Sequence, residues 1–169
     1  MLRKKPRRRE LTPEQAVDAA AAGAAAVVLL ARRDFCSAEL RHKLETQGFE
    51  PATVQAVVRE FIERGYLNDE RYGRQFVAYH AERGHGPLRI ERELAQRGLD
   101  AALIAEALAE AEDWTQRARE LRIRRFGLGI PERWPEKAKQ ARFLQYRGFS
   151  NDHIRSALGS EMATDLDES

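Results

Sequence analysis

The stretch FLQYRGFSNDHIRSAL (residues 143–158) repeats an arrangement found twice earlier, in KLETQGFEPATVQAVV (43–58) and ELAQRGLDAALIAEAL (93–108). In each copy a leucine lies four residues before a glycine, an apolar residue follows the glycine, and further apolar residues recur at helical spacing. The three glycines are Gly48, Gly98 and Gly148, so the copies lie fifty residues apart. This regular spacing predicts three copies of one structural unit.

Each copy has the pattern of a helix, a tight corner and a second helix. Glycine tolerates the left-handed backbone that often ends a helix, and the residue after it then packs back on the last turn. Phe149 is therefore expected to pack on Leu144, with equivalent pairs in the other two copies. Asp100 and Ser150 are suited to cap the second helix of their copies. Because the middle unit has two neighbours, we expect its corner to be the most sensitive to substitution.

The other helix boundaries follow similar rules. Gly65 and Gly127 are each followed by an apolar residue and are predicted to form further corners. Thr12 and Gln15 are predicted to form a capping box at the start of the first helix. No segment alternates with period two, so strands are not expected. We predict nine helices, at 13–33, 38–47, 51–64, 70–83, 87–97, 101–112, 114–126, 135–147 and 151–159.

The predicted fold is all-α, with three tandem three-helix repeats of helix-turn-helix type in an elongated, curved array. The predicted boundaries are a basic disordered tail (1–12), repeat 1 (13–68), repeat 2 (69–112), repeat 3 (113–160) and an acidic tail (161–169). No apolar run is hydrophobic enough to cross a membrane, no secretory signal is recognisable, and there is one cysteine. We therefore expect a cytoplasmic protein that is not bound to membranes.

Three motifs give the chain a family resemblance. GYLNDERYG (65–73), GPLRIERELAQRGL (86–99) and FLQYRGFSNDHIRSAL (143–158) resemble the signature stretches of the RecX regulatory proteins. The resemblance implies tandem three-helix repeats. It also implies binding to the RecA recombinase filament on single-stranded DNA, with inhibition of strand exchange, ATPase and co-protease activity. Such a protein would modulate homologous recombination, DNA repair and the SOS response. The arginine-rich start and the alanine-rich first helix are not part of the pattern and carry no such inference.

Charge is distributed unevenly along the chain. Residues 114–147 contain ten Lys or Arg against three Glu, whereas residues 69–113 contain six Arg against ten acidic residues. A basic zone of this kind favours binding to phosphate groups or to an acidic protein face. Eleven residues are the predicted contacts with filament or DNA: Arg89, Arg92, Arg97, Arg117, Arg119, Arg122, Arg124, Arg125, Arg133, Lys137 and Lys139. We expect Arg119, Arg122 and Arg125 to be replaceable together with little change in thermal stability.

No catalytic, cofactor or metal site is predicted. His80 and His85 are five residues apart, which does not place two ligands on one helix face. Gly84 and Gly86 flank His85 without the lysine of a phosphate-binding loop. The predicted protein is a monomeric, non-enzymatic regulator without a cofactor or small-molecule substrate. It binds single-stranded DNA together with the recombinase, and duplex DNA only weakly.

Two other functions remain open at this point. The helix–glycine–helix pairs resemble helix-turn-helix units, so the chain is alternatively a stand-alone DNA-binding module. Only the third pair carries polar residues at the start of its second helix, namely Asn151, Asp152, His153 and Arg155. The other alternative is a scaffold that binds proteins only.

Overall fold

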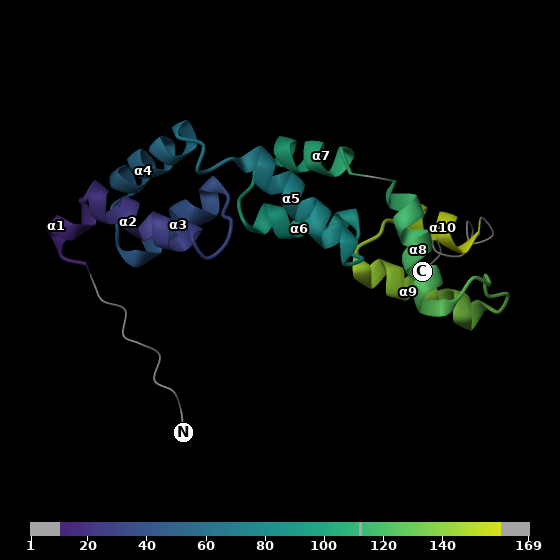
Figure 1. Cartoon of the computed structure of the whole chain (residues 1–169). Helices are drawn as coiled ribbons and strands as arrows, with labels where there is room; N and C mark the ends of the chain where they lie inside the picture. Colours follow the sequence, from purple (N-terminus) through teal and green to yellow (C-terminus); the bar gives the residue numbers. More distant parts are fainter. Residues whose placement is uncertain (1–10, 112, 160–169) are drawn as a thin grey trace, which may run out of the picture. The chain divides into compact units, whose positions relative to one another are not determined.

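The computed structural model describes residues 11–111 and 113–159 of the 169-residue chain, and every regular element in these residues is a helix (Figure 1). The ten helices are α1 (Pro13–Ala16), α2 (Ala19–Leu30), α3 (Ser37–Gln47), α4 (Pro51–Glu63), α5 (Asp69–Glu82), α6 (Pro87–Gln96), α7 (Ala101–Ala109), α8 (Trp114–Phe126), α9 (Trp134–Arg147) and α10 (Asn151–Leu158). The all-helical prediction is confirmed. The predicted tails lie outside the described residues, except for residues 11 and 12.

The single helix predicted over 13–33 is wrong. Thr12 and Gln15 do form the capping box, but α1 ends at Ala16 after four residues. The Asp18 carboxylate then accepts hydrogen bonds from the backbone N–H groups of Ala20 and Ala21, which starts α2. An aspartate is a strong N-cap, so this residue begins a second helix where a continuous one was expected. Gly23 lies inside α2 without breaking it.

The glycine corners have the predicted backbone. The φ angles are 106° at Gly48, 82° at Gly98 and 91° at Gly148. In the third corner Phe149 N–H donates to the Leu144 carbonyl and Gly148 N–H to the Gln145 carbonyl, which is the Schellman pattern. Phe149 is buried, and so are its counterparts in the other two copies, Phe49 and Leu99.

The two further corners differ from each other. At Gly65 the φ angle is 75°, and the ring of Tyr66 packs edge-on against Phe61 with centroids 5.5 Å apart. At Gly127 φ is 90° but ψ is 176°, so the backbone is not left-handed helical there. Leu128 is accordingly 81% exposed and does not pack back on the helix. The sequence predicted a compact corner at this position, and that part of the prediction is wrong.

Side chains also cap the starts of other helices, including the predicted caps Asp100 and Ser150. The carboxylates of Asp100 and Asp113 accept backbone N–H groups at the starts of α7 and α8. Ser150 caps α10 and forms a capping box with His153. Asn68 accepts the Arg71 N–H near the start of α5. These caps satisfy N–H groups that have no partner within the helix.

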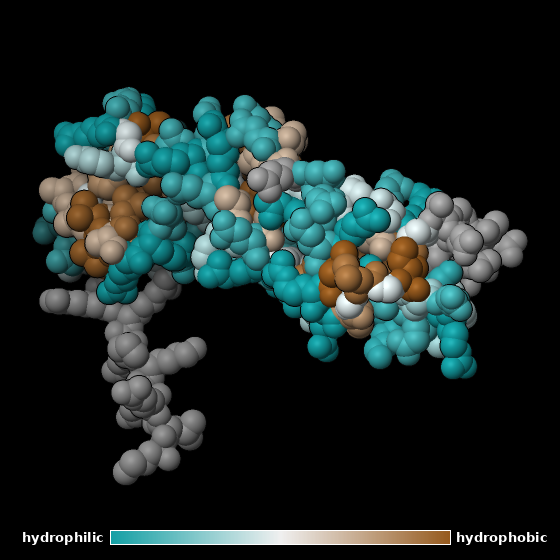
Figure 2. Space-filling model, turned by 45° about the vertical axis from the view of Figure 1, so that its right-hand side comes forward, coloured by the Kyte–Doolittle hydropathy of each residue, from teal (hydrophilic) through white to brown (hydrophobic). Residues whose placement is uncertain are grey.

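The chain divides into two compact units. Of the described residues, the first comprises 11–72 together with 97–99. Its core lies among α2, α3 and α4, where the fully buried side chains of Ala22, Leu40, Leu44 and Val54 meet. Hydrophobic side chains are also exposed on this unit, as the brown surface at the left of Figure 2 shows.

The corner at 97–99 is held firmly in this first unit. The Cys36 thiol is buried and donates to the Arg97 carbonyl at 3.3 Å. Arg97 also contacts the Glu39 carboxylate at 3.5 Å and the Tyr72 hydroxyl at 3.3 Å. Burial raises the pKa of the Cys36 thiol, so little of it is the reactive thiolate at neutral pH.

The second unit comprises, within the described part of the chain, residues 73–96, 100–111 and 113–159. Ala118, Leu144, Phe149, Ile154 and Leu158 form a core among α8, α9 and α10. A second set of contacts joins the loop before α6 to the third corner. Gly86 N–H donates to the Arg147 carbonyl at 2.8 Å, and Leu88 N–H to the Gly148 carbonyl at 3.1 Å. Within the described residues, no helix has the length and hydrophobicity needed to cross a bilayer.

Candidate nucleic-acid interface

Four arginines from three separate segments surround one pocket in the second unit. Arg83 follows α5, Arg124 and Arg125 lie on α8, and Arg147 ends α9. Leu121 and Phe143 complete the lining, and the pocket has a volume of about 590 Å³. We call this set the arginine pocket. A cluster of guanidinium groups beside an aromatic ring suits phosphate oxygens or carboxylates.

The arginines are positioned by aromatic rings and by the backbone. The Arg147 guanidinium lies 5.4 Å from the centre of the Phe143 ring, and its Nη1 donates to the Arg83 carbonyl at 3.4 Å. The Arg83 guanidinium stacks over the Tyr79 ring at 3.5 Å. Stacking on a ring restrains a long side chain without neutralising its charge. All charged side chains that line the pocket are arginines, and none of the four forms an ion pair with a described residue.

Sequence reasoning identified only half of the arginine pocket. Arg124 and Arg125 belonged to the predicted contact surface, whereas Arg83 and Arg147 did not. The sequence of α8 shows the arginines on that helix. It does not show which residues of the loop after α5 and of the end of α9 lie beside them. The available signal was an arginine directly before a helix-ending glycine, as in Arg83-Gly84 and Arg147-Gly148.

Arg122 must be removed from the predicted contact surface. Its side chain is 2% exposed, and its guanidinium donates to the carbonyls of Leu128 and Gly129 and to the Gln140 side chain. Burial, followed by the charge of Arg119, lowers the pKa of Arg122, although an arginine stays protonated at neutral pH. Arg122 therefore holds the connection after α8 instead of facing a partner. This burial argues against the expectation that it is replaceable without loss of stability.

The remaining basic residues of α8 do not share one face. Successive residues of a helix are about 100° apart, so Arg119 lies roughly 120° to 140° around the axis from Arg124 and Arg125. Arg119 is exposed, and Arg117 is partly buried. Beyond α8, Arg133 is exposed at the start of α9 and Lys139 pairs with Glu136 at 3.7 Å, while Lys137 is partly buried. The predicted basic residues therefore point in several directions and do not form one patch. Only Arg124 and Arg125 among them lie together, in the arginine pocket.

The arginines of the middle motif have different surroundings. Arg89 is paired with Glu93 through its Nε at 2.8 Å, and Arg97 takes part in the contacts of the first unit described above. Arg92 is exposed and lines a second hollow, a groove of about 680 Å³. This groove lies between α6 and the third corner, with Tyr146 and Asn151 on its far side. Tyr146 is 83% exposed, so its ring is available for stacking.

The helix-turn-helix alternative receives little support from the third pair. His153 is used in the capping box with Ser150, and Arg155 pairs with Asp152. Asn151 remains at the edge of the groove. Since side chains that read bases must be available at the start of the recognition helix, this helix has few to offer.

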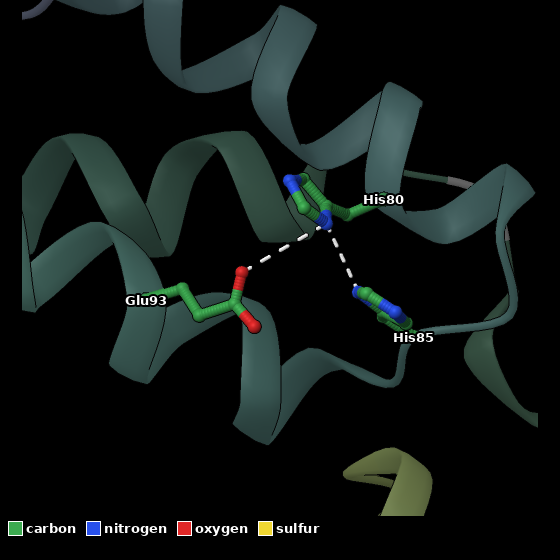
Figure 3. Close-up of side chains that lie close together, drawn as sticks. All are labelled: His80, His85 and Glu93. Atoms are coloured by element: carbon green, nitrogen blue, oxygen red, sulfur yellow. Dashed lines mark hydrogen bonds and ion pairs between the residues drawn. The ribbon is translucent and has the colours of Figure 1, made fainter. Parts of the chain in front are cut away.

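His80, His85 and Glu93 form a cluster that sequence reasoning missed (Figure 3). The five-residue spacing excludes a site only on one continuous helix, and Gly84, with a φ of 76°, ends α5 between the two histidines. Burial, followed by the charge of Arg89, lowers the pKa of His85. Burial alone would raise the pKa of Glu93, but the hydrogen bond and charge of Arg89 outweigh it and lower that pKa. The three residues offer ligand atoms within 4.8 Å of one another, so they are placed as a metal site would require.

Comparison with known proteins identifies the family. Sequence models of the first, second and third three-helix domains of RecX match residues 22–61, 68–108 and 111–158. The chain belongs to the RecX family. The matched segments contain all three motifs on which the resemblance rested, except for residues 65–67 at the start of the first motif.

Individual RecX proteins are similar over most of their length. The Regulatory protein RecX of Halorhodospira halophila is 44% identical over 78% of this chain and 83% of its own. That of Pseudomonas savastanoi pv. phaseolicola is 41% identical over 81% of this chain and 89% of its own. The crystal structure of RecX from Lactobacillus salivarius shares the fold, with a TM-score of 0.73 and 20% identity over 82% of this chain and 93% of that one. The RecX fold of tandem three-helix domains is therefore confirmed.

Proposed function

We propose that this chain is a non-enzymatic regulator that binds the RecA–DNA filament and inhibits its recombinase, ATPase and co-protease activities. It would thereby modulate DNA repair and the SOS response in the cytoplasm. Family membership supports a regulatory role, since the relatives are named regulatory proteins. The arginine pocket is the observation that supports a partner rich in negative charge.

The charge of the arginine pocket is available to such a partner. Arg83, Arg124 and Arg125 are exposed, and no carboxylate lines the pocket to compete with an incoming anion. A phosphate of single-stranded DNA fits this chemistry, because guanidinium groups bind phosphate oxygens in pairs. An acidic face of the recombinase fits it equally well, and a filament presents both surfaces. Binding is therefore expected to weaken as salt rises.

The groove beside the middle motif gives this proposal a second contact region. Arg92 supplies charge and Tyr146 an exposed ring, and both lie in the second unit with the arginine pocket. Aromatic stacking contributes about 1–3 kcal/mol per base in proteins that bind single strands. Several modest contacts on one filament add up through effective concentration, so no single large interface is needed.

The alternatives predict different binding behaviour. A stand-alone DNA-binding module should bind DNA without recombinase and with affinity that depends on sequence. A protein-only scaffold should bind recombinase monomers as well as filaments, with little salt dependence from DNA. The proposed regulator should instead prefer assembled filaments to either component alone.

The test is a titration of the full chain into RecA assembled on single-stranded DNA with ATP. ATP hydrolysis and strand exchange are expected to fall at substoichiometric amounts of the chain. Bovine serum albumin at equal concentration controls for non-specific effects. Unchanged rates over a wide concentration range would contradict the proposed function.

A further inference from the structure

Three potential metal ligands converge between the end of α5 and the middle of α6. His80 is on α5, His85 lies in the loop that follows, and Glu93 is on α6 (Figure 3). His80 Nδ1 lies 2.9 Å from His85 Nδ1 and 3.8 Å from Glu93 Oε2. Each of the three residues offers a ligand atom within 4.8 Å of the other two, and all three side chains are partly buried. Two imidazoles and a carboxylate are a common ligand set for zinc.

The spacing is close to that of a zinc site. Ligands at about 2.0–2.1 Å from zinc in tetrahedral geometry lie roughly 3.3 Å from one another. The His80–His85 distance of 2.9 Å is therefore slightly short and the His80–Glu93 distance of 3.8 Å slightly long. Small side-chain rotations correct both, since the two histidines lie on opposite sides of a glycine and Glu93 has a flexible side chain. We propose that His80, His85 and Glu93 bind one Zn²⁺ ion, with the fourth coordination position left to water.

The surroundings of the three residues allow this arrangement. Arg89 Nε donates to Glu93 Oε1 at 2.8 Å, which leaves Oε2 directed at His80. Such a partner on the second oxygen orients a ligating carboxylate, as outer-shell groups do in metal sites. The His80 ring is also fixed from behind, because it stacks on Phe76 with centroids 4.1 Å apart.

The competing explanation is a hydrogen bond between the two imidazoles without any metal. A separation of 2.9 Å is an ordinary length for an N–H···N contact. That contact would leave the carboxylate at 3.8 Å, beyond hydrogen-bonding distance. Arg89 pairs with Glu93 in either case, so the two explanations differ in whether one cation engages all three groups at once.

Zinc at this position would fix a loop that matters for the second unit. Residues 83–86 carry Arg83 of the arginine pocket, and Gly86 N–H donates to the Arg147 carbonyl of the third corner. A cation held by α5, the loop and α6 would therefore stabilise the junction between the middle motif and the third corner. This inference does not depend on the proposed function.

The test is isothermal titration of the full chain with ZnCl₂ alone in a chelator-free buffer, repeated for three variants. His85→Ala and Glu93→Gln each remove one ligand, and the matched control His42→Ala removes an exposed histidine of α3. Loss of even an outer-shell partner lowers metal affinity about 10- to 100-fold, so loss of a ligand should lower it by at least ~100-fold. His80→Ala is avoided because that ring packs on Phe76.

Co²⁺ provides a second measurement on the same proteins, since its visible absorption is weak in the octahedral aqueous ion and becomes strong in a tetrahedral site. One equivalent of Zn²⁺ is expected to bind to the wild type and the His42→Ala variant and to raise their melting temperatures. The His85→Ala and Glu93→Gln variants, checked for folding by circular dichroism, should show neither effect. Failure of the wild type to bind Zn²⁺, or equal binding by the two ligand variants, would overturn the proposal.

Discussion

Replacement of Gly148 by alanine should be far more costly than the same replacement at Gly48. Both residues have positive φ, so each alanine costs about 1–2 kcal/mol in backbone strain. At Gly48 the added Cβ would meet only the Leu11 side chain, at 3.6 Å or more. At Gly148 it would lie 2.4 Å from Arg89 Cβ and 2.7 Å from Arg89 N, far inside normal contact.

The additional cost at Gly148 is estimated from the contacts that must be lost. Moving Arg89 away disturbs the hydrogen bonds Leu88 N–H to the Gly148 carbonyl and Gly86 N–H to the Arg147 carbonyl. Each contributes about 1 kcal/mol, and overpacking adds about 1–3 kcal/mol. The Gly148→Ala variant should therefore lose about 4–7 kcal/mol of unfolding free energy, against about 1–2 kcal/mol for Gly48→Ala.

Urea denaturation followed by circular dichroism measures both losses. Gly23→Ala is the matched control, because Gly23 lies inside α2 and nothing lies within 4 Å of its added Cβ. This control should gain about 0.5–1 kcal/mol, since alanine favours a helix interior over glycine. Equal losses for Gly148→Ala and Gly48→Ala would refute the reasoning. The structure favours Gly148 over the middle corner as the most sensitive, because an added Cβ at Gly98 would clash with one atom, Ala38 Cβ at 2.8 Å, whereas at Gly148 it would clash with Arg89 Cβ at 2.4 Å and with the Arg89 backbone.

Two further predictions concern buried or paired charges. Arg122→Ala should lower the unfolding free energy by about 2–4 kcal/mol, because it leaves backbone carbonyls without donors. The control Arg119→Ala changes an exposed residue and should alter the unfolding free energy by less than ~0.5 kcal/mol. Similar thermal melts for the two variants would contradict the structural role of Arg122. Burial alone would raise the pKa of Glu39, but Arg33 and Arg97 outweigh it and lower that pKa. A carboxylate whose pKa is lowered on folding stabilises the protein at pH values above its ordinary pKa, and this stabilisation is lost as the pH falls. Between neutral pH and about pH 3, the urea midpoint of the wild type should therefore fall more than that of the Glu39→Gln variant.

The helices and corners were largely predictable because their signals are local. A glycine followed by an apolar residue and a capping side chain identifies its corner within six residues, as at Gly148. The break before α2 was also local, but a long alanine run concealed the cap at Asp18. At Gly127 the ψ of 176° turns the chain away from a compact corner, and Leu128 stays exposed.

The sites were less predictable because they combine distant segments. Spacing counts the charges on α8 but does not say that Arg122 points inward, since its partners are carbonyls of the following connection. Arg83 and Arg147 become neighbours only through the contact of the loop with the third corner. The histidine cluster similarly combines separate segments, because the chain turns at Gly84 between His80 and His85 and the third residue, Glu93, comes from the next helix.

Inhibition of recombinase by matched charge-reversal variants tests the central claim most directly. The double variant Arg124→Glu/Arg125→Glu changes the arginine pocket, and Arg41→Glu/Arg59→Glu makes the same charge change at exposed positions of the first unit. Each is titrated into RecA on single-stranded DNA while ATP hydrolysis is recorded. Loss of inhibition at least ~10-fold greater for the pocket variant than for the control is predicted, which corresponds to about 1.4 kcal/mol of binding free energy. Full inhibition by the pocket variant, with a normal melting temperature, would contradict the account.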